Sequence, residues 1–342
     1  MKILIYVGYQ KESVNKEYWL SKGMGGSEYC VMKLSEQFAN NGHDVTITGG
    51  ITDQDVDGVK YRSIESFINS GENYFDIVIS TNYIHYIQML DDFGIDYGKS
   101  YFWIHNEEFY TWYNGVELPN EGLDYLNHDK LDKIIAVSEW QKNVLVEKYG
   151  LEPSKVSVIG NAISPSDFDD INQEKYKNKV IYTSSPDRGL AQLLDIWPKL
   201  KKINPELTLS LDVRWLGHLP PSELYKQIKS SEYWIYPSTY PETYCITALE
   251  MMMGRVKLIS TDTANLKTLL DGKCGLIRSD LSEPLMKETI ISSYVFLRDN
   301  ENVAEKYLNI GEGFARQQTW EVRYDEWMKV IEGILEDTSK ND

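Results

Sequence analysis

Residues 233–253, with the sequence YWIYPSTYPETYCITALEMMM, combine a strand, a loop and a helix. The first four residues are aromatic or β-branched, which is typical of a buried strand. The two prolines that follow disfavour helix, and an apolar run with helical spacing begins at Ile246. A strand that leads through a loop into a helix is the repeating unit of a parallel α/β sheet.

The same stretch carries two glutamates, Glu242 and Glu250. We expect Glu242 beside the helix N-terminus and Glu250 two turns deeper. The backbone N–H groups of Thr243, Tyr244 and Cys245 would then lack intrahelical partners and could bind phosphate oxygens, while the two carboxylates could hold sugar hydroxyls. The spacing also fits an N-terminal helix carboxylate followed by a solvated glutamate. The rest of the chain has to decide between these interpretations.

Short runs of β-branched or aromatic residues recur along the chain, with helical patterns between several of them. They lie at residues 3–7, 44–48, 75–80, 100–104, 133–137, 180–183, 207–213, 233–236 and 256–260. This alternation predicts an α/β fold whose parallel sheets carry helices on both faces. The 342 residues exceed the usual size of a single core, so we expect two doubly wound domains joined near the polar stretch 164–178. Such sheets bind ligands at the carboxyl ends of their strands, which predicts a site in a cleft between the domains.

The composition excludes several classes of partner. A net charge of −17 argues against nucleic acid and anionic membrane, because both need clustered Lys and Arg. The sequence contains no run of about 18 uncharged apolar residues, the length that a membrane-spanning helix needs. The apolar run that opens the chain stops at Gly8, which is typical of a first strand and too short for a signal peptide. Cys30, Cys245 and Cys274 lie in apolar contexts, as reduced thiols do. The sequence therefore predicts a soluble, cytoplasmic protein.

A glycine-rich loop at residues 23–28, GMGGSE, follows the first strand and opens a helix that ends at Asn41. Gly25 and Gly26 would let the backbone approach a ligand closely, with the N–H groups at the helix start facing a phosphate. A plain loop capped by Ser27 is the alternative. We favour the phosphate-binding interpretation.

His105 follows a run of buried character, residues 101–104, and so falls at the carboxyl end of an expected strand. Ligand-facing residues of an open sheet lie at that end. A single histidine is more often structural, but the other four of the five histidines have less favourable positions. His105 is therefore the candidate histidine of the site.

Arg188 lies in the first strand-to-helix turn of the expected second domain, just before Gly189. At the start of a helix it would direct a permanent cation toward the ligand. The alternative is a surface arginine paired with Asp187. Its position favours binding of phosphate.

Taken in order along the chain, these segments resemble the family 4 glycosyltransferases of the GT-B fold. The resemblance covers nearly the whole chain and rests on the Gly-Gly-Ser-Glu loop, residues 134–140, residues 158–163, the Arg188 turn, residues 216–224, residues 236–238 and the stretch from Glu242 to Glu250. It implies two Rossmann-like domains that face a central cleft. Residues 1–163 would bind the acceptor, residues 164–305 would bind the nucleotide-sugar donor, and helices within residues 306–342 would cross back to the first domain.

The resemblance also implies roles for single residues. Glu242 would contact the transferred sugar, His105 would line the reacting face, and both are therefore the expected catalytic residues. Glu250 would bind the ribose hydroxyls, and Arg188 would replace the lysine that this family places before a glycine. The donor-binding positions implied are Gly25, Gly26, Arg188, Gly217, Glu242, Thr243, Tyr244, Cys245 and Glu250.

Two departures from the family pattern affect phosphate binding. The family usually has a second cation shortly before its lysine, but Thr183, Ser184 and Ser185 occupy this region here. The usual Gly-Phe-Gly after the first glutamate is replaced by Thr-Tyr-Cys at residues 243–245, which keeps the backbone donors and adds bulk. Neutralisation of a diphosphate would thus rest on Arg188 and helix termini, with Arg214 and Arg255 as further candidate cations.

By resemblance, the chain is interpreted as a retaining glycosyltransferase that moves a sugar from a nucleotide-diphosphate-sugar, with UDP or GDP as the expected nucleotide, to an acceptor hydroxyl. The acceptor would be a glycan, a protein or a small molecule, and neither a metal ion nor a separate cofactor is expected. A nucleotide-sugar epimerase of the same fold is the enzymatic alternative. A catalytically silent protein that binds nucleotide-sugars or acts as a scaffold is the non-enzymatic one.

Overall fold

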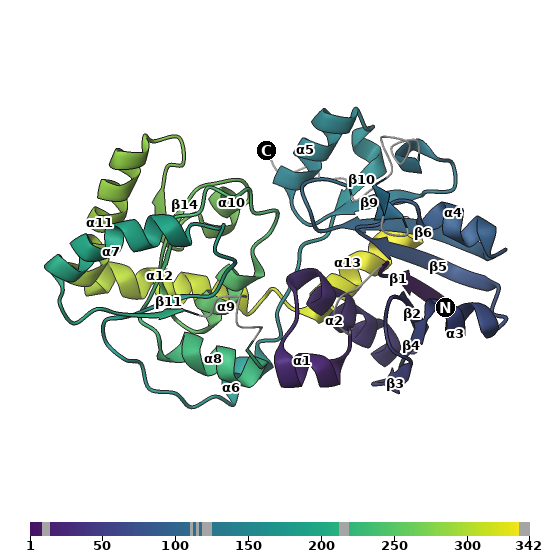
Figure 1. The fold of residues 1–342 in the computed structure, drawn as a ribbon, viewed down its shortest axis with the longest axis horizontal. Coiled ribbons are helices and arrows are strands. Elements are labelled where there is room, and N and C mark those ends of the chain that lie inside the picture. Colours follow the sequence, from purple (N-terminus) through teal and green to yellow (C-terminus); the bar gives the residue numbers. More distant parts are fainter. Residues whose placement is uncertain (9–13, 110–111, 114–115, 118–124, 212–218, 335–342) are drawn as a thin grey trace. The chain divides into compact units, whose positions relative to one another are not determined.

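The computed structural model describes residues 1–8, 14–109, 112–113, 116–117, 125–211 and 219–334, and it divides into two compact units (Figure 1). The first unit comprises Met1–Tyr18, Met24–Asn161 and Trp320–Asp342. The second comprises Trp19–Gly23 and Ala162–Thr319. Each unit is built around its own sheet, and the two are described separately.

The first unit holds a sheet of eight strands in the order β10-β9-β6-β5-β1-β2-β4-β3. Its strands are β1 (Lys2–Tyr6), β2 (Asp44–Gly49), β3 (Gln54–Val56), β4 (Val59–Ser63), β5 (Tyr74–Thr81), β6 (Asp96–Ile104), β9 (Lys133–Ala136) and β10 (Val156–Val158). All pairs are parallel except β3 with β4. The strand order reverses between β1 and β5, so the loops after these two strands flank the switch point of the sheet.

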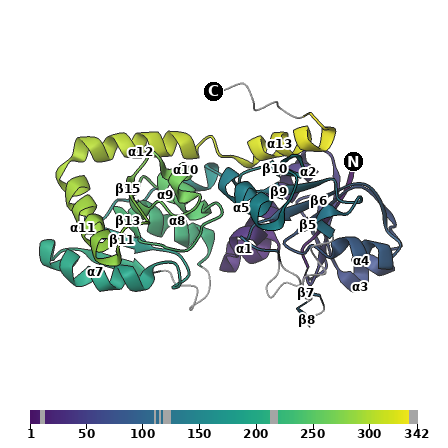
Figure 2. The ribbon, with the colours of Figure 1, turned by 90° about the horizontal axis from the view of Figure 1, so that it is seen from above.

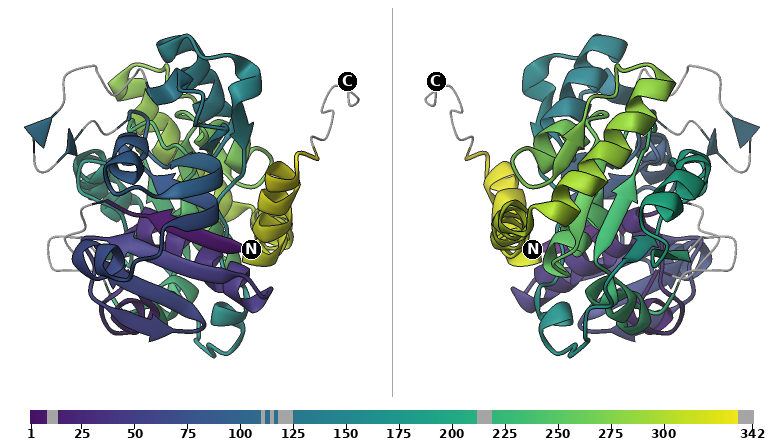
Figure 3. Two further views of the ribbon diagram at one scale, coloured as in Figure 1. Left: turned by 90° about the vertical axis from the view of Figure 1, so that its right-hand side faces the viewer. Right: turned by 90° about the vertical axis from the view of Figure 1, so that its left-hand side faces the viewer.

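Helices and one small sheet complete the first unit. Its elements are α2 (Gly26–Asn40), α3 (Ile64–Asn69), α4 (Tyr86–Asp92), α5 (Glu139–Tyr149), the short 3-10 helix Pro153–Lys155, α13 (Trp320–Glu332), and the antiparallel pair β7 (Trp112–Tyr113) and β8 (Val116–Glu117). The residues of α1 (Lys16–Lys22) are divided between the units. The C-terminal helix α13, yellow in Figure 3, packs against α2. Its Trp327 is fully buried, with ring centroids 6.0 Å from Tyr101 and 5.4 Å from Trp103 of β6.

The second unit holds a parallel sheet of five strands in the order β12-β11-β13-β14-β15. Its strands are β11 (Lys179–Tyr182), β12 (Thr208–Leu211), β13 (Tyr233–Tyr236), β14 (Lys257–Thr261) and β15 (Gly275–Ile277), and its helices are α6 (Ser166–Asp169), α7 (Leu190–Ile203), α8 (Pro221–Ser230), α9 (Ile246–Met253), α10 (Leu266–Leu270), α11 (Glu283–Asp299) and α12 (Glu301–Ala315). Among the helices of this unit, α11 packs on α7, and α12 packs on α9 (Figure 2). The order reverses between β11 and β13, so the loops after these strands flank a second switch point.

The predicted α/β class with two parallel sheets is confirmed, and each of the nine expected strands is found within a few residues of its expected bounds where the structure describes it. The hairpin of β3 and β4 was not predicted. Its turn consists of Asp57 and Gly58, both with positive φ (50° and 78°), which is the Asp-Gly signature of a two-residue hairpin. That dipeptide was a usable signal, but the short, polar strand β3 gave little support to it.

Apart from residues 19–23, which group with the second unit, the chain passes between the units at residues 161/162 and again at 319/320, whereas the sequence placed these points at 163/164 and 305/306. Of the last two helices, α13 belongs to the first unit and α12 to the second. Gly311 of α12 allows this packing, because a Cβ at that position would lie 3.2 Å from Cγ of Met252 in α9. The expectation that helices within residues 306–342 cross back to the first domain stays a prediction.

Candidate functional site

Two loops of the second unit meet at the switch point of its sheet. One follows β11 and carries Arg188; the other follows β13 and carries Glu242. Gly189 allows the loops to approach, since its φ is +99° and an added Cβ would lie 2.8 Å from the carbonyl group of Pro237. A side chain at position 189 would push the two loops apart.

An ion pair connects these loops. Nη1 of Arg188 donates to Oε1 of Glu242 over 2.7 Å. The guanidinium also lies over the ring of Tyr240, 4.1 Å from its centroid. Burial is the largest single influence and lowers the pKa of Arg188, but the charge of Glu242, its hydrogen bond to the guanidinium and the neighbouring Tyr236 and Tyr240 together raise that pKa. Arg188 is thus a permanent cation at the switch point, and it is paired with Glu242 and not with Asp187.

The carboxylate of Glu242 is buried, with 5% of the residue exposed, and it receives a second hydrogen bond. The hydroxyl of Tyr236, the last residue of β13, donates to the same Oε1 atom over 2.6 Å. Oγ of Ser184 lies 3.3 Å from that hydroxyl. Burial, and then the charge of Glu242, raise the pKa of Tyr236, so its phenol stays protonated and remains a donor. A guanidinium and a phenol together compensate the buried charge of Glu242.

The helix that carries Glu250 begins later than expected. The first residue of α9 is Ile246, preceded by Cys245 in a left-handed conformation with φ of 76°. Thr243 and Tyr244 therefore precede the helix, so the expected series of helix-terminal N–H groups at residues 243–245 is wrong in register. Asn265 fixes this loop instead: its backbone N–H donates to the Glu242 carbonyl and its Nδ2 to the Tyr244 carbonyl, each over 3.2 Å.

Glu250 lies in the second turn of α9, nearer the N-terminus than expected, and its side chain is half-buried. Burial, followed by the charge of Glu242, raises the pKa of the Cys245 thiol well above its usual value. A protonated thiol is a weak nucleophile, so Cys245 contributes its position in the chain and not its sulfur chemistry. Gly217 lies outside the residues that the structure describes.

In the first unit, Gly25 and Gly26 lie at the start of α2, with Gly25 as the N-cap residue. Ser27 does not cap this helix; its hydroxyl donates to Oε2 of Glu28 over 3.0 Å. That carboxylate lies against Gly25, where an added Cβ would meet Oε2 at 2.2 Å. An anion that approached Gly25 would require the Glu28 side chain to move.

His105 directly follows β6, as the sequence predicted for a residue at a strand's carboxyl end. Its backbone N–H donates to Oδ1 of Asn82 over 3.0 Å, and its ring packs on Trp103 with centroids 4.4 Å apart. Burial lowers the pKa of His105 to about 3. The imidazole is therefore neutral at neutral pH and can act as a hydrogen-bonding group but not as a cation.

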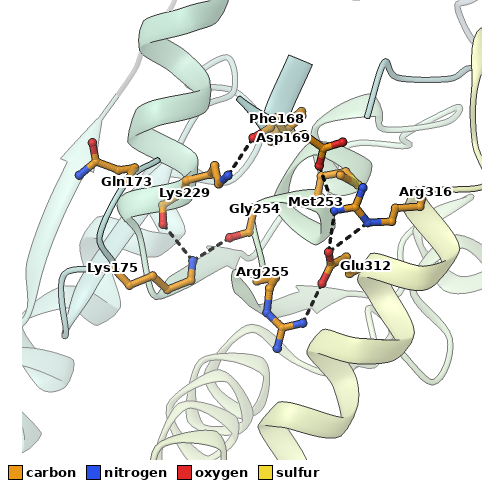
Figure 4. Close-up of a pocket in the computed structure, with 10 residues that line it drawn as sticks. All are labelled: Phe168, Asp169, Gln173, Lys175, Lys229, Met253, Gly254, Arg255, Glu312 and Arg316. Atoms are coloured by element: carbon orange, nitrogen blue, oxygen red, sulfur yellow. Dashed lines mark hydrogen bonds and ion pairs between the residues drawn. The ribbon is translucent and has the colours of Figure 1, made fainter. Parts of the chain in front are cut away.

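A separate pocket of about 400 Å³ lies in the second unit, among the ends of α6, α8, α9 and α12 (Figure 4). Its charged lining consists of Lys175, Lys229, Arg255, Arg316, Asp169 and Glu312. Nζ of Lys175 donates to the carbonyls of Lys229, Ser231 and Gly254 over 2.7–3.1 Å. These carbonyls directly precede β13 and β14 or end the helices before them, so the pocket lies at the amino ends of the strands and away from Arg188.

The cations of this pocket are engaged by the protein itself. Lys229 donates to the carbonyls of Phe168 and Ile171, and both arginines pair with Glu312. An anion would have to displace these partners. The pocket is better explained as a structural cluster, whose lysines donate hydrogen bonds to carbonyl groups at helix C-termini, than as a ligand site.

Within the residues that the structure describes, no group of three or more His, Cys, Asp or Glu side chains is arranged to hold a metal ion. None of the helices in the same residues is long and apolar enough to cross a bilayer.

Comparisons with known proteins give a sequence match over part of the chain and structural matches over nearly all of it. No family model matches it. The phosphatidyl-myo-inositol mannosyltransferase of Mycobacterium tuberculosis is 22% identical over 233 residues, which cover 60% of this chain and 61% of that protein. The match thus spans less than two thirds of this relative's length.

Solved structures decide the fold. Sucrose-phosphate synthase from Thermosynechococcus elongatus superposes with a TM-score of 0.67 at 10% identity and covers 98% of this chain and 99% of that one. HepE from Anabaena, in complex with UDP, gives a TM-score of 0.66 at 13% identity and covers 97% and 100%. The chain has the GT-B fold. The GT-B expectation from the sequence is therefore confirmed, while the low identities leave the activity to be argued from the site.

Within this GT-B chain, the sequence had singled out Arg188 and Glu242 but not their mutual contact. It assigned no role to Tyr236, Tyr240 or Ser184. The signal available for Tyr236 was its position as the last residue of a buried strand, where side chains of an open sheet reach the ligand edge.

Proposed function

We propose that this protein is a retaining glycosyltransferase of the family 4 type, which transfers a sugar from a nucleotide-diphosphate-sugar to an acceptor hydroxyl without a metal ion. The second unit would bind the donor and the first unit the acceptor. The observation that carries the proposal is the convergence of Arg188 and Glu242 at the switch point of the second sheet, where one cation and one buried carboxylate lie 2.7 Å apart. A diphosphate needs the first, and sugar hydroxyls need the second.

The reaction requires charge stabilisation and positioning. As the bond between the anomeric carbon and the diphosphate oxygen breaks, its electron pair leaves with the diphosphate, and Arg188 and the first turn of α9 would stabilise that negative charge. The acceptor oxygen forms a bond to the same face of the anomeric carbon, and its proton passes to a diphosphate oxygen. This route retains configuration and needs no protein nucleophile.

The remaining residues receive supporting roles. Glu242 would bind hydroxyls of the transferred sugar, and Glu250 those of the ribose. His105, neutral because of its burial, would donate or accept a hydrogen bond at the reacting face. Gly25 and Gly26 would approach the diphosphate once Glu28 has moved. Gly217 is proposed, from the resemblance alone, to lie near the base.

UDP-sugars are the first donors to test, because HepE has been crystallised with UDP and with UDP-glucose. GDP-sugars are the second. The acceptor is assigned only by class, as a hydroxyl of a glycan, a protein or a small molecule.

The test is donor consumption. The protein would be incubated with UDP-, GDP- and ADP-sugars in EDTA, with a panel of glycan and small-molecule acceptors, and products followed by NMR. The proposal expects release of one nucleoside diphosphate and a product with the donor's anomeric configuration. An interconverted nucleotide-sugar with no transfer would favour the epimerase. Binding without consumption, in every combination, would favour the silent binding protein.

A further inference from the structure

Oε1 of Glu242 accepts hydrogen bonds from two donors that differ in exposure. Arg188 reaches it from the loop after β11, through a side chain that is 28% exposed. Tyr236 reaches it from the end of β13 and is 1% exposed. The Tyr236 ring stacks on Trp234, with centroids 4.5 Å apart and planes 14° apart. Arg188 is thus partly exposed, whereas Tyr236 is enclosed in the core.

The direction of the hydrogen bonds is set by chemistry. An ionised carboxylate can only accept, so Tyr236 must donate to Glu242. The Tyr236 oxygen is then available as an acceptor, and Ser184, 3.3 Å away, is the group placed to donate to it. Ser184, Tyr236 and Glu242 thus form a chain of hydrogen bonds that runs from the loop after β11 to the carboxylate, which accepts the last one.

Donor binding would change only one of these contacts. A diphosphate carries more negative charge than Glu242 and competes with it for the guanidinium of Arg188. When Arg188 turns to the diphosphate, Glu242 loses its only ion-pair partner among those that the structure shows for it. Without another donor the buried carboxylate would swing away or take up a proton.

We propose that Tyr236 is a positioning residue. Its hydrogen bond holds the Glu242 carboxylate toward the transferred sugar when Arg188 leaves that carboxylate and binds the donor diphosphate. This inference rests on the proposed function. It assigns Tyr236 to recognition of the sugar, and not of the nucleotide, although it touches neither.

The matched variants are Tyr236→Phe and Tyr233→Phe. Both tyrosines lie on β13 and are 1% exposed, but Tyr233 packs against Tyr294 and Lys257, and among the described residues it makes no hydrogen bond, ion pair or ring contact with the loop of Glu242. A third variant, Ser184→Ala, removes only the hydroxyl group that begins the chain of hydrogen bonds from Ser184 to Glu242. Binding of UDP, GDP and ADP, each with and without its glucose ester, is measured by calorimetry for the wild type and the three variants.

The expected result is a split between nucleotide and nucleotide-sugar. Tyr236→Phe should bind the free nucleotide within about twofold of the wild type. Its affinity for the glucose ester and its rate of turnover should both fall by about tenfold or more, as expected for loss of a hydrogen bond to a charged group. Ser184→Ala should show a smaller loss in the same direction, and Tyr233→Phe none.

Two results would overturn the inference separately from the proposed function. If Tyr236→Phe matches the wild type for every ligand, or loses nucleotide and glucose ester equally, Tyr236 has no positioning role even though the donor site stands. If the wild type binds no nucleotide at all, the proposed function fails and the inference fails with it.

Discussion

The guanidinium of Arg188 lies 2.7 Å from the carboxylate of Glu242, although the two residues are 54 positions apart in the sequence. This contact joins the loops on either side of the switch point in the second sheet. Glu242 is therefore paired with the cation that a donor diphosphate would need. Arg188 is held in an internal ion pair, and under the proposed function donor binding would include an exchange of partners.

Replacement of Glu242 by Gln tests this exchange. The substitution keeps the shape of the side chain but removes the charge that competes for Arg188. We expect UDP or another cognate nucleotide to bind as tightly as before or more tightly, while sugar transfer falls about tenfold or more. Calorimetry and initial rates measure the two effects. Glu223→Gln, on α8 and hydrogen-bonded to Gln227, is the control. Parallel loss of nucleotide affinity and rate would contradict the exchange.

Gly189→Ala tests the approach of the two loops, with Gly272→Ala as its match. Both glycines have positive φ, +99° and +67°, so alanine is strained at each by about 1–2 kcal/mol. Only at Gly189 does the new Cβ also meet backbone, 2.8 Å from Pro237; nothing lies within 4 Å at Gly272. We expect chemical denaturation to show a loss in the free energy of unfolding larger by about 1–2 kcal/mol for Gly189→Ala. Equal losses would argue against close packing of the loops.

His105 should make stability depend on pH. Its pKa is about 3 in the folded protein and about 6.5 when unfolded, so the unfolded state binds more protons between these values. Stability is therefore lost as pH falls from about 6.5 toward 3, by about 2 kcal/mol at pH 5 for this residue alone. His105→Gln should lose less stability between pH 8 and pH 5 than the wild type. His85, with a pKa lowered by burial to about 4, leaves part of the slope in place. The same slope in both proteins would refute this role for His105.

The pocket lined by Lys175 should contribute to stability and not to nucleotide binding, which substitution of Lys175 can test. Lys175→Met removes an ammonium that donates to three carbonyls, which should cost about 2–3 kcal/mol of unfolding free energy. Lys177 is exposed like Lys175 but makes no hydrogen bond or ion pair with the described residues, so Lys177→Met should change the unfolding free energy by less than about 0.5 kcal/mol. Nucleotide binding should be unchanged in both. A loss of nucleotide affinity in Lys175→Met would mean that this pocket contributes to the ligand site.

The sequence predicted the fold well because its signals are local. Runs of buried β-branched and aromatic residues, each followed by a loop and an amphipathic helix, recur in both units, and their order alone implies parallel sheets with ligands at the carboxyl ends of the strands. The positions of Arg188 and Glu242 followed from that rule. The hairpin at Asp57 and Gly58 was missed because its first strand is short and polar.

The sequence could not predict how the site residues meet. The contact of Arg188 with Glu242, and that of Tyr236 with the same carboxylate, depends on packing between loops that are far apart in the chain. The start of α9 was placed too early, because the left-handed conformation of Cys245 and the hydrogen bonds from Asn265 have no clear local signature. The place of α12 likewise depends on its long-range packing against α9.

Nucleotide binding by Arg188→Ala tests the central claim most directly. Calorimetric titration with UDP-glucose, and then with GDP- and ADP-sugars, would compare the wild type with this variant and with Arg278→Ala, whose arginine is exposed and pairs with Asp280. Both variants remove the same charge from the second unit, so a general effect of charge is controlled. We expect the wild type and Arg278→Ala to bind one nucleotide-sugar alike, and Arg188→Ala to bind it at least about tenfold more weakly. Equal affinity in all three proteins would contradict it.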